Sequence, residues 1–182
     1  MKEIILVLLH QAIDRLYSVD GKNIEDGVSE RNFCARLAHH LENLMREYDN
    51  EHQSAEFKNY YADVEYNRME DVSGDLISKQ VYYSNGLHSV TCDLLIHSRD
   101  AEHRNLLALE MKKKHNSQNV ESDKKRLETL VLPHDERIKH EYVCDTLVSI
   151  FMEIDKEGCQ LEIYEYDNDA KKVSVISIPH HI

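Results

Sequence analysis

The order of apolar and polar residues predicts two helices at the start of the chain. Between residues 3 and 17 the apolar residues recur at helical spacing and form one stripe. That stripe consists of Ile5, Leu8, Leu9, Ala12, Ile13 and Leu16. The pair Asp20-Gly21 is expected to end this helix. Ser29 is a favourable N-cap residue for a second helix, which the pair Asp49-Asn50 is expected to stop.

Most of the remaining chain reads as β-strands with one more helix. Aromatic, β-branched and continuous apolar runs predict the strands. The expected strands are 60–68, 91–96, 106–112, 142–154, 160–166 and 173–178, with a short strand and turn over 82–86. Ser122 is expected to cap a helix that ends before Pro133. This order indicates one domain, 1–182, of the α/β (α+β) class, with helices packed on a sheet.

Three charged residues in the middle of the chain suggest a catalytic site. Side chains alternate along a strand, so Glu110 and Lys112 point to one face while Leu109 and Met111 point to the other. A carboxylate and an ammonium at the end of a buried strand are costly unless they are paired or used. Asp93, on the preceding strand, can reach the same place. Two carboxylates and a lysine at one point predict a site for a hard cation with a cationic helper.

The charge of the chain is strongly negative overall but positive beside these residues. With 22 Lys and Arg against 34 Asp and Glu, the formal net charge is −12, so the whole surface repels polyanions. Between Glu110 and Arg126, however, six basic residues stand against three acids. The basic residues are Lys112, Lys113, Lys114, Lys124, Lys125 and Arg126. Any contact with nucleic acid is therefore expected here, beside the predicted metal site.

Two other classes of protein are disfavoured by the sequence. The longest early apolar run, Ile4 to Leu9, is six residues, which is too short to span a membrane, so no membrane partner and a cytoplasmic location are expected. The four cysteines stand singly without a C-x-x-C pair, which predicts buried free thiols rather than a zinc site or disulfides. They are Cys34, Cys92, Cys144 and Cys159.

The chain resembles the PD-(D/E)xK, or restriction-endonuclease-like, nucleases. Their motif is an Asp early in one core strand and a (D/E)-x-K at the end of the next, here Asp93 and Glu110-Met111-Lys112, 17 positions apart (110 − 93). Their αβββαβ core corresponds to about residues 29–154, with the N-terminal helix and C-terminal strands as additions. Glu30 matches the acidic residue that many members carry on the first core helix. The chain departs from the pattern at Cys92, where the family often has proline.

The resemblance implies a metal-dependent nuclease that leaves 5′-phosphate and 3′-hydroxyl ends, with DNA favoured over RNA. Asp93, Glu110 and a backbone carbonyl near Met111 would hold Mg²⁺ or Mn²⁺, Lys112 would assist at the scissile phosphate, and Glu30 would be an outer-shell ligand. Nucleic acid would contact the other basic residues, and a homodimer is expected. Those basic residues are Lys113, Lys114, Lys124, Lys125 and Arg126.

Several alternatives remain open at this point. The fold could be catalytically silent, with the acids forming only an ion pair with Lys112, or it could be a protein–protein module. Glu30 could merely complement the dipole of its helix. Metal chemistry through His39-His40 is disfavoured because adjacent histidines on a helix point apart, and through His180-His181 because a frayed chain end is expected there.

Overall fold

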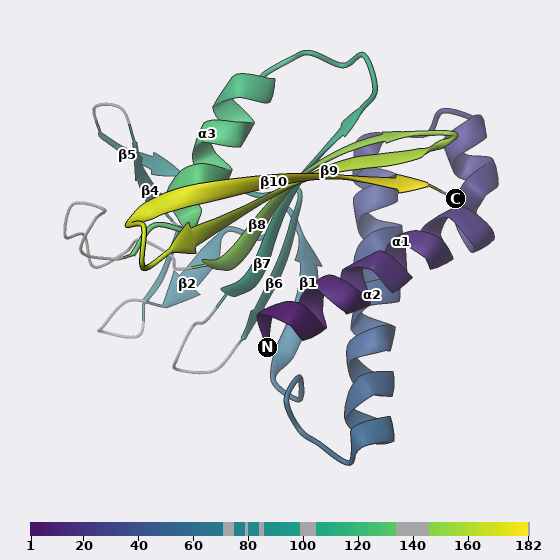
Figure 1. Cartoon of the computed structure of the whole chain (residues 1–182), viewed down its shortest axis with the longest axis horizontal. Helices are drawn as coiled ribbons and strands as arrows, with labels where there is room; N and C mark the ends of the chain where they lie inside the picture. The colour runs from purple at the N-terminus through teal and green to yellow at the C-terminus, as the bar shows by residue number, and fades with distance from the viewer. Residues whose placement is uncertain (71–74, 79, 84–85, 99–104, 134–145, 182) are drawn as a thin grey trace.

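The computed structural model describes residues 1–70, 75–78, 80–83, 86–98, 105–133 and 146–181. Within these ranges the protein has a mixed α/β fold with three helices and a six-stranded mixed sheet (Figure 1). The expected α+β class is therefore confirmed. No described helix is long and apolar enough to cross a membrane.

The three helices begin close to where the sequence predicts but end differently. They are α1 (Lys2–Glu25), α2 (Glu30–His52) and α3 (Val120–Leu130). The prediction that Asp20-Gly21 ends the first helix is wrong. The buried Asp20 side chain accepts hydrogen bonds from Arg36 and His40 of α2, both 2.8 Å long, so it ties the two helices together and α1 continues.

The N-cap predicted for α2 is confirmed, whereas the N-cap predicted for α3 is wrong. The Ser29 hydroxyl accepts a hydrogen bond from the Asn32 backbone N–H, as an N-cap should. Helix α3 begins before the predicted cap Ser122, because Asn119 adopts a left-handed conformation (φ 61°) and turns the chain first.

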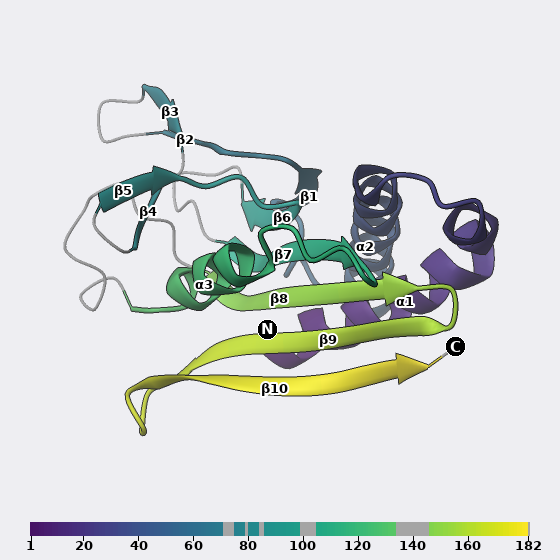
Figure 2. The ribbon, with the colours of Figure 1, turned by 90° about the horizontal axis from the view of Figure 1, so that it is seen from above.

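The central sheet has the order β1-β6-β7-β8-β9-β10, in which β7 and β8 are parallel and all other neighbours antiparallel. Its strands are β1 (Tyr60–Val64), β6 (Leu94–Ser98), β7 (Asn105–Lys113), β8 (Thr146–Asp155), β9 (Gly158–Asp167) and β10 (Lys172–His181). Two small hairpins stand apart from it, between β1 and β6 in the chain (Figure 2). They consist of β2 (Arg68–Glu70) with β3 (Leu76–Ser78), and β4 (Gln80–Tyr83) with β5 (Gly86–Ser89).

Three strand predictions need correction or completion. The strand expected over 60–68 stops at Val64, because Glu65 has a positive φ of 52° and donates its backbone N–H to the Asp93 carbonyl. The first residues expected in the strand 142–154, and with them Cys144, lie outside the described residues. The frayed end expected at His180-His181 is wrong, since both residues pair with β9.

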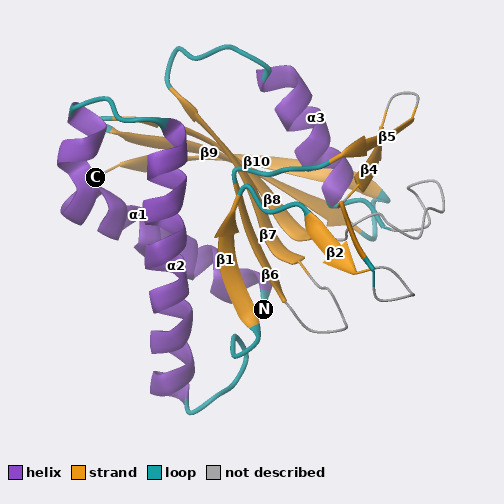
Figure 3. Ribbon diagram, turned by 180° about the vertical axis from the view of Figure 1, so that it is seen from behind, coloured by secondary structure: helices purple, strands orange, loops and turns teal. Residues whose placement is uncertain are grey.

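The helices cover opposite faces of the sheet (Figure 3). Helices α1 and α2 pack on one face, where Met111 and Ile150 join the larger apolar cluster. Helix α3 packs on the other face, where Leu127 joins Ala108 and Phe151 in the smaller apolar cluster. Strand β7 is thus buried on both sides, and it is the strand that carries Glu110. The three described cysteines, Cys34, Cys92 and Cys159, are buried and take part in no disulfide, as predicted.

The turn between β8 and β9 predicts a contrast between two glycine substitutions. Gly158 has φ +145°, and a Cβ there would lie 2.3 Å from the His180 carbonyl oxygen, whereas a Cβ on Gly21 in α1 meets nothing within 4 Å. Gly158→Ala should lower the free energy of unfolding by about 2 kcal/mol or more. Gly21→Ala should raise it by about 0.5–1 kcal/mol, because alanine favours the helix. Urea unfolding of both variants checks this, and a stable Gly158→Ala protein would contradict the close approach of β10.

Candidate active site

Asp93 and the end of β7 meet at one point. Asp93 lies one residue before β6, not within the strand as expected, and β6 pairs antiparallel with β7 through Leu94 and Leu109. The Met111 backbone N–H donates a hydrogen bond of 2.8 Å to Asp93 Oδ2. The Asp93 carboxylate is thereby fixed beside Glu110, where β7 continues past the end of its pairing with β6 but stays paired with β8.

Glu110 is a buried carboxylate with only partial compensation. Glu110 is 3% exposed and its side chain faces α3. The Arg126 guanidinium of that helix lies 3.0 Å from Glu110 Oε1. That oxygen nevertheless accepts no hydrogen bond of good geometry from the described residues. Burial raises the pKa of Glu110 well above its ordinary value; Arg126 opposes this, and the nearby Asp93 and Asp123 add to it.

Lys112 shares the face of Glu110, as strand alternation predicts, but its ion-pair partner was not expected. Its Nζ lies 3.0 Å from Oδ2 of Asp123, a residue of α3 that is 4% exposed and also pairs with Arg126. Burial lowers the pKa of Lys112, but the partner Asp123, together with the charges of Asp93 and Glu30, raises it by more. The pKa is therefore raised overall and the lysine stays charged.

The sequence contains a pattern that points to Asp123, which the motif alone does not include. Asp123 precedes Leu127 and Leu130 by four and seven positions, which places it on the buried stripe of α3. A charged residue on such a stripe faces the sheet, and Arg126 flanks the same stripe.

Glu30 also reaches the end of β7, from the other face of the sheet. Its Oε1 accepts hydrogen bonds of 2.8 Å from the Lys113 backbone N–H and from the Asn116 side-chain amide. Its charge also helps to raise the pKa of Lys112. Glu30 therefore does more than complement the dipole of α2, although it lies in the first turn of that helix.

The basic residues grouped in the sequence separate into two groups in space. Lys113 donates to the Gly27 carbonyl and Lys114 pairs with Asp155, so both lie beside the α1–α2 turn. The other group is on α3, across the sheet, and each member is paired with an acid. Those pairs are Lys124–Glu162 at 2.6 Å, Lys125–Glu128 at 2.7 Å, and Arg126 with Glu110 and Asp123. The positive charge of this stretch is therefore largely balanced locally.

The donor set fits Mg²⁺ better than a transition metal. Within the described residues no group of three or more His, Cys, Asp or Glu side chains is arranged around a common point. Magnesium, however, is commonly held by one or two carboxylates together with water and substrate phosphate. Asp93 and Glu110 provide two adjacent carboxylates, and the unsatisfied Glu110 Oε1 is an oxygen that a cation would stabilise.

No family model, no curated protein and no solved structure matches this chain.

The raised pKa of Glu110 predicts a stability that depends on pH. A carboxyl group with a raised pKa in the folded state binds a proton more tightly there than in the unfolded chain. The stability that Glu110 contributes is therefore greatest below its unfolded pKa of 4.5, and it is lost as the pH rises through the folded pKa. Glu110→Gln mimics the protonated form. It should raise the free energy of unfolding at pH 8 by about 1 kcal/mol or more.

Urea unfolding from pH 4.5 to 8 measures this effect. Glu121→Gln, at an exposed position of α3, is the matched control and should keep the pH dependence of the original protein. Identical pH profiles for Glu110→Gln and the original protein would contradict the raised pKa.

Proposed function

We propose that this protein is a metal-dependent nuclease that hydrolyses phosphodiester bonds in nucleic acid, with DNA as the expected substrate. The observation that carries the proposal is the meeting of Asp93, Glu110 and Lys112 at one end of β6 and β7. Two carboxylates that repel each other beside a charged lysine are costly to keep together, and phosphodiester hydrolysis gives each of them a use.

The order of the elements supports the same proposal. The sequence α2, β1, β6, β7, α3, β8 follows the αβββαβ order of the PD-(D/E)xK core, and its four strands are neighbours in the sheet. The hairpins β2–β3 and β4–β5 are insertions between the first and second core strands. Helix α1 and strands β9 and β10 are additions at the two ends.

The residues divide the chemistry as follows. Mg²⁺ or Mn²⁺, held by Asp93, Glu110 and a carbonyl at Met111, would supply an activated water and neutralise charge on the phosphate. Lys112 would donate from Nζ to the attacking water or to a phosphate oxygen, after leaving Asp123. Arg126 balances the Glu110 charge, and Glu30 fixes the backbone where β7 ends. The expected products carry 5′-phosphate and 3′-hydroxyl ends.

One observation favours a catalytically silent fold instead. Lys112 is bound to Asp123 and Arg126 to Glu110, so the four groups form a connected ion-pair network across the β7–α3 contact. Such a network can serve packing specificity alone. On this alternative the protein binds nucleic acid or another protein without cleaving it.

The nuclease proposal predicts a divalent-cation requirement and three inactive variants. Lys112→Ala, Asp93→Asn and Glu110→Gln should each lower cleavage by about 100-fold or more, as removal of a group acting at the reacting atoms does. Mg²⁺ or Mn²⁺ should support cleavage, Ca²⁺ at most binding, and EDTA should stop it. The assay uses duplex DNA, single-stranded DNA and RNA, with Glu121→Gln as control.

A separate measurement distinguishes the silent fold. Mn²⁺ binding, followed by electron paramagnetic resonance, should weaken in Asp93→Asn and Glu110→Gln but persist in Lys112→Ala. No Mn²⁺ binding, together with no cleavage of any substrate by the original protein, would favour the silent fold. Undiminished cleavage in excess EDTA would contradict the metal mechanism.

The split of the basic residues predicts which group contacts nucleic acid. The candidate site faces α3, so Lys124→Gln with Lys125→Gln should weaken DNA binding and lower the salt slope by about one for each lost phosphate contact. Glutamine avoids placing a new acid beside Glu162 or Glu128. Lys113→Gln with Lys114→Gln makes the same change of charge beside the α1–α2 turn and should leave the slope unchanged. Filter binding at several salt concentrations compares them, and equal slopes would contradict contact through α3.

A further inference from the structure

Helix α1 has more apolar surface than the fold covers. Its residues 4–9, Ile-Ile-Leu-Val-Leu-Leu, are apolar without interruption, so apolar side chains point to every side of the helix. A helix that is apolar all round is normally covered all round. Ile5, Leu8 and Leu9 are buried against the rest of the protein, but Val7 is 55% exposed. The side of α1 that carries Val7 and the partly buried Ile4 therefore lacks a full cover within the part of the chain that the structure describes.

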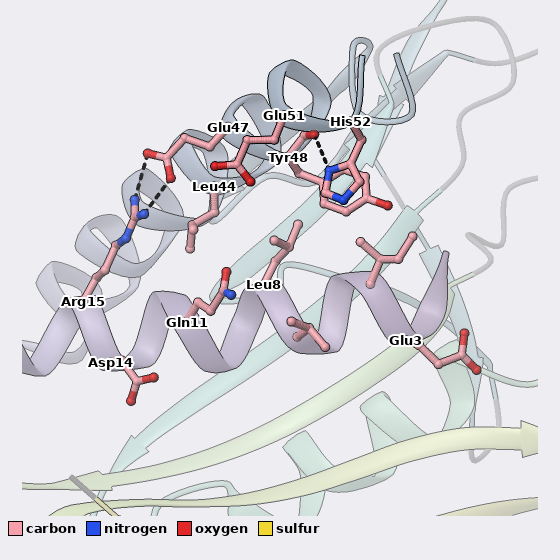
Figure 4. Close-up of a pocket in the computed structure, with 12 residues that line it drawn as sticks. Glu3, Leu8, Gln11, Asp14, Arg15, Leu44, Glu47, Tyr48, Glu51 and His52 are labelled. Atoms are coloured by element: carbon pink, nitrogen blue, oxygen red, sulfur yellow. Dashed lines mark hydrogen bonds and ion pairs between the residues drawn. The ribbon is translucent and has the colours of Figure 1, made fainter. Parts of the chain in front are cut away.

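This side of α1 forms one wall of a groove, and α2 forms the other (Figure 4). The groove has a volume of about 700 Å³ and an apolar floor. The floor consists of Ile4, Val7, Leu8 and Leu44. Along α1 the groove extends from Glu3 to Arg15, which corresponds to about 18 Å of helix, or slightly more than three turns. A groove of this length matches about three turns of a third helix.

The rim of the groove is acidic. Glu3 and Asp14 line it from α1, and Glu47 and Glu51 from α2. The Asp14 carboxylate, however, is already bonded to the His180 ring at 2.9 Å. The guanidinium of Arg15 is held by Glu47 through hydrogen bonds of 3.0 and 2.6 Å, so this pair is already neutral. His52 stacks on Tyr48 at the far end (Figure 4). The remaining acids leave the groove with a negative rim above an apolar floor.

We propose that the groove between α1 and α2 binds a basic amphipathic helix of a partner protein. The partner's apolar side covers Val7 and the floor, and its Lys and Arg side chains reach Glu3 and Glu51 on opposite walls. This is helix-in-groove recognition, with apolar anchors spaced at one helical turn. The charge of the rim disfavours the other occupants: nucleic acid and anionic membranes are repelled, and so is a second copy with its own net charge of −12.

The groove is independent of the candidate active site. It lies on the α1–α2 side of the sheet, whereas Glu110 and Lys112 face α3 on the opposite side. A bound helix therefore leaves the candidate active site open, and the proposal holds whether or not the protein cleaves nucleic acid.

The test uses an 18-residue fluorescent peptide of Leu and Lys, arranged so that the leucines share one helical face. Binding to the full chain is measured by fluorescence anisotropy. Val7→Asp should raise Kd about tenfold or more, because it places a charge on the apolar floor at a position that is open to solvent in the free protein. Glu51→Lys should weaken binding by a similar factor and reduce its salt dependence.

Matched controls separate docking in the groove from general attraction to an acidic protein. Val19→Asp makes the same substitution on α1 at a position 66% exposed and outside the groove, and Asp169→Lys makes the same charge reversal in the exposed β9–β10 turn. Both should bind the peptide as the original protein does. A peptide of equal composition with its leucines scattered around the helix should bind at least about tenfold more weakly.

Three outcomes would overturn the proposal. Equal binding of the scattered peptide, or equal loss in Val7→Asp and Val19→Asp, would show that only overall charge attracts the peptide. If a Leu–Glu peptide bound more tightly than the Leu–Lys peptide, the partner helix would have to be acidic rather than basic. Self-association at 100 µM concentration that Val7→Asp abolishes, without binding of the Leu–Lys peptide, would assign the groove to a second copy instead.

Discussion

The free-energy cost of burying the Glu110 carboxylate in β7 determines which charged groups lie between the sheet and α3. Because helices cover both faces of this strand, Glu110 is removed from water and must be compensated by the protein. The compensation comes from α3 through Arg126, which in turn is held by Asp123, the partner of Lys112. The contact that packs α3 on the sheet is therefore also the one that sets the charge of the candidate site, so stability and chemistry depend on the same four groups.

The two faces of the sheet do different work in this protein. The α3 face combines a small apolar cluster with the ion-pair network at the candidate site. The α1–α2 face holds most of the apolar core, and its polar contacts tie the two helices to each other, as Asp20 does with His40, and also to the sheet, as Lys2 does with Glu165. This division permits the surface beside α1 to change without disturbing the charges around Glu110.

Periodic patterns predicted most of the fold, while contacts between distant residues explain what they missed. The alternation along β7 correctly set Glu110 and Lys112 against Met111, because it depends only on neighbours in the chain. The end of α1 depends on Arg36 and His40, which no local pattern links to Asp20. The basic residues separated for a related reason: Lys113 points away from Lys112, and α3 carries its own lysines across the sheet to other acids.

The last strand closes against the first helix, and this has a consequence for how the chain folds. Lys2 pairs with Glu165 and His10 contacts His180, at sequence separations of 163 and 170 residues. Contacts of this range form slowly, because a long loop must close before they gain anything. On a ribosome, α1 can pack on α2 early, but the side of α1 that faces β9 and β10 has no partner until these two strands have been made. Its apolar turns are thus the segment that most needs protection from aggregation during synthesis.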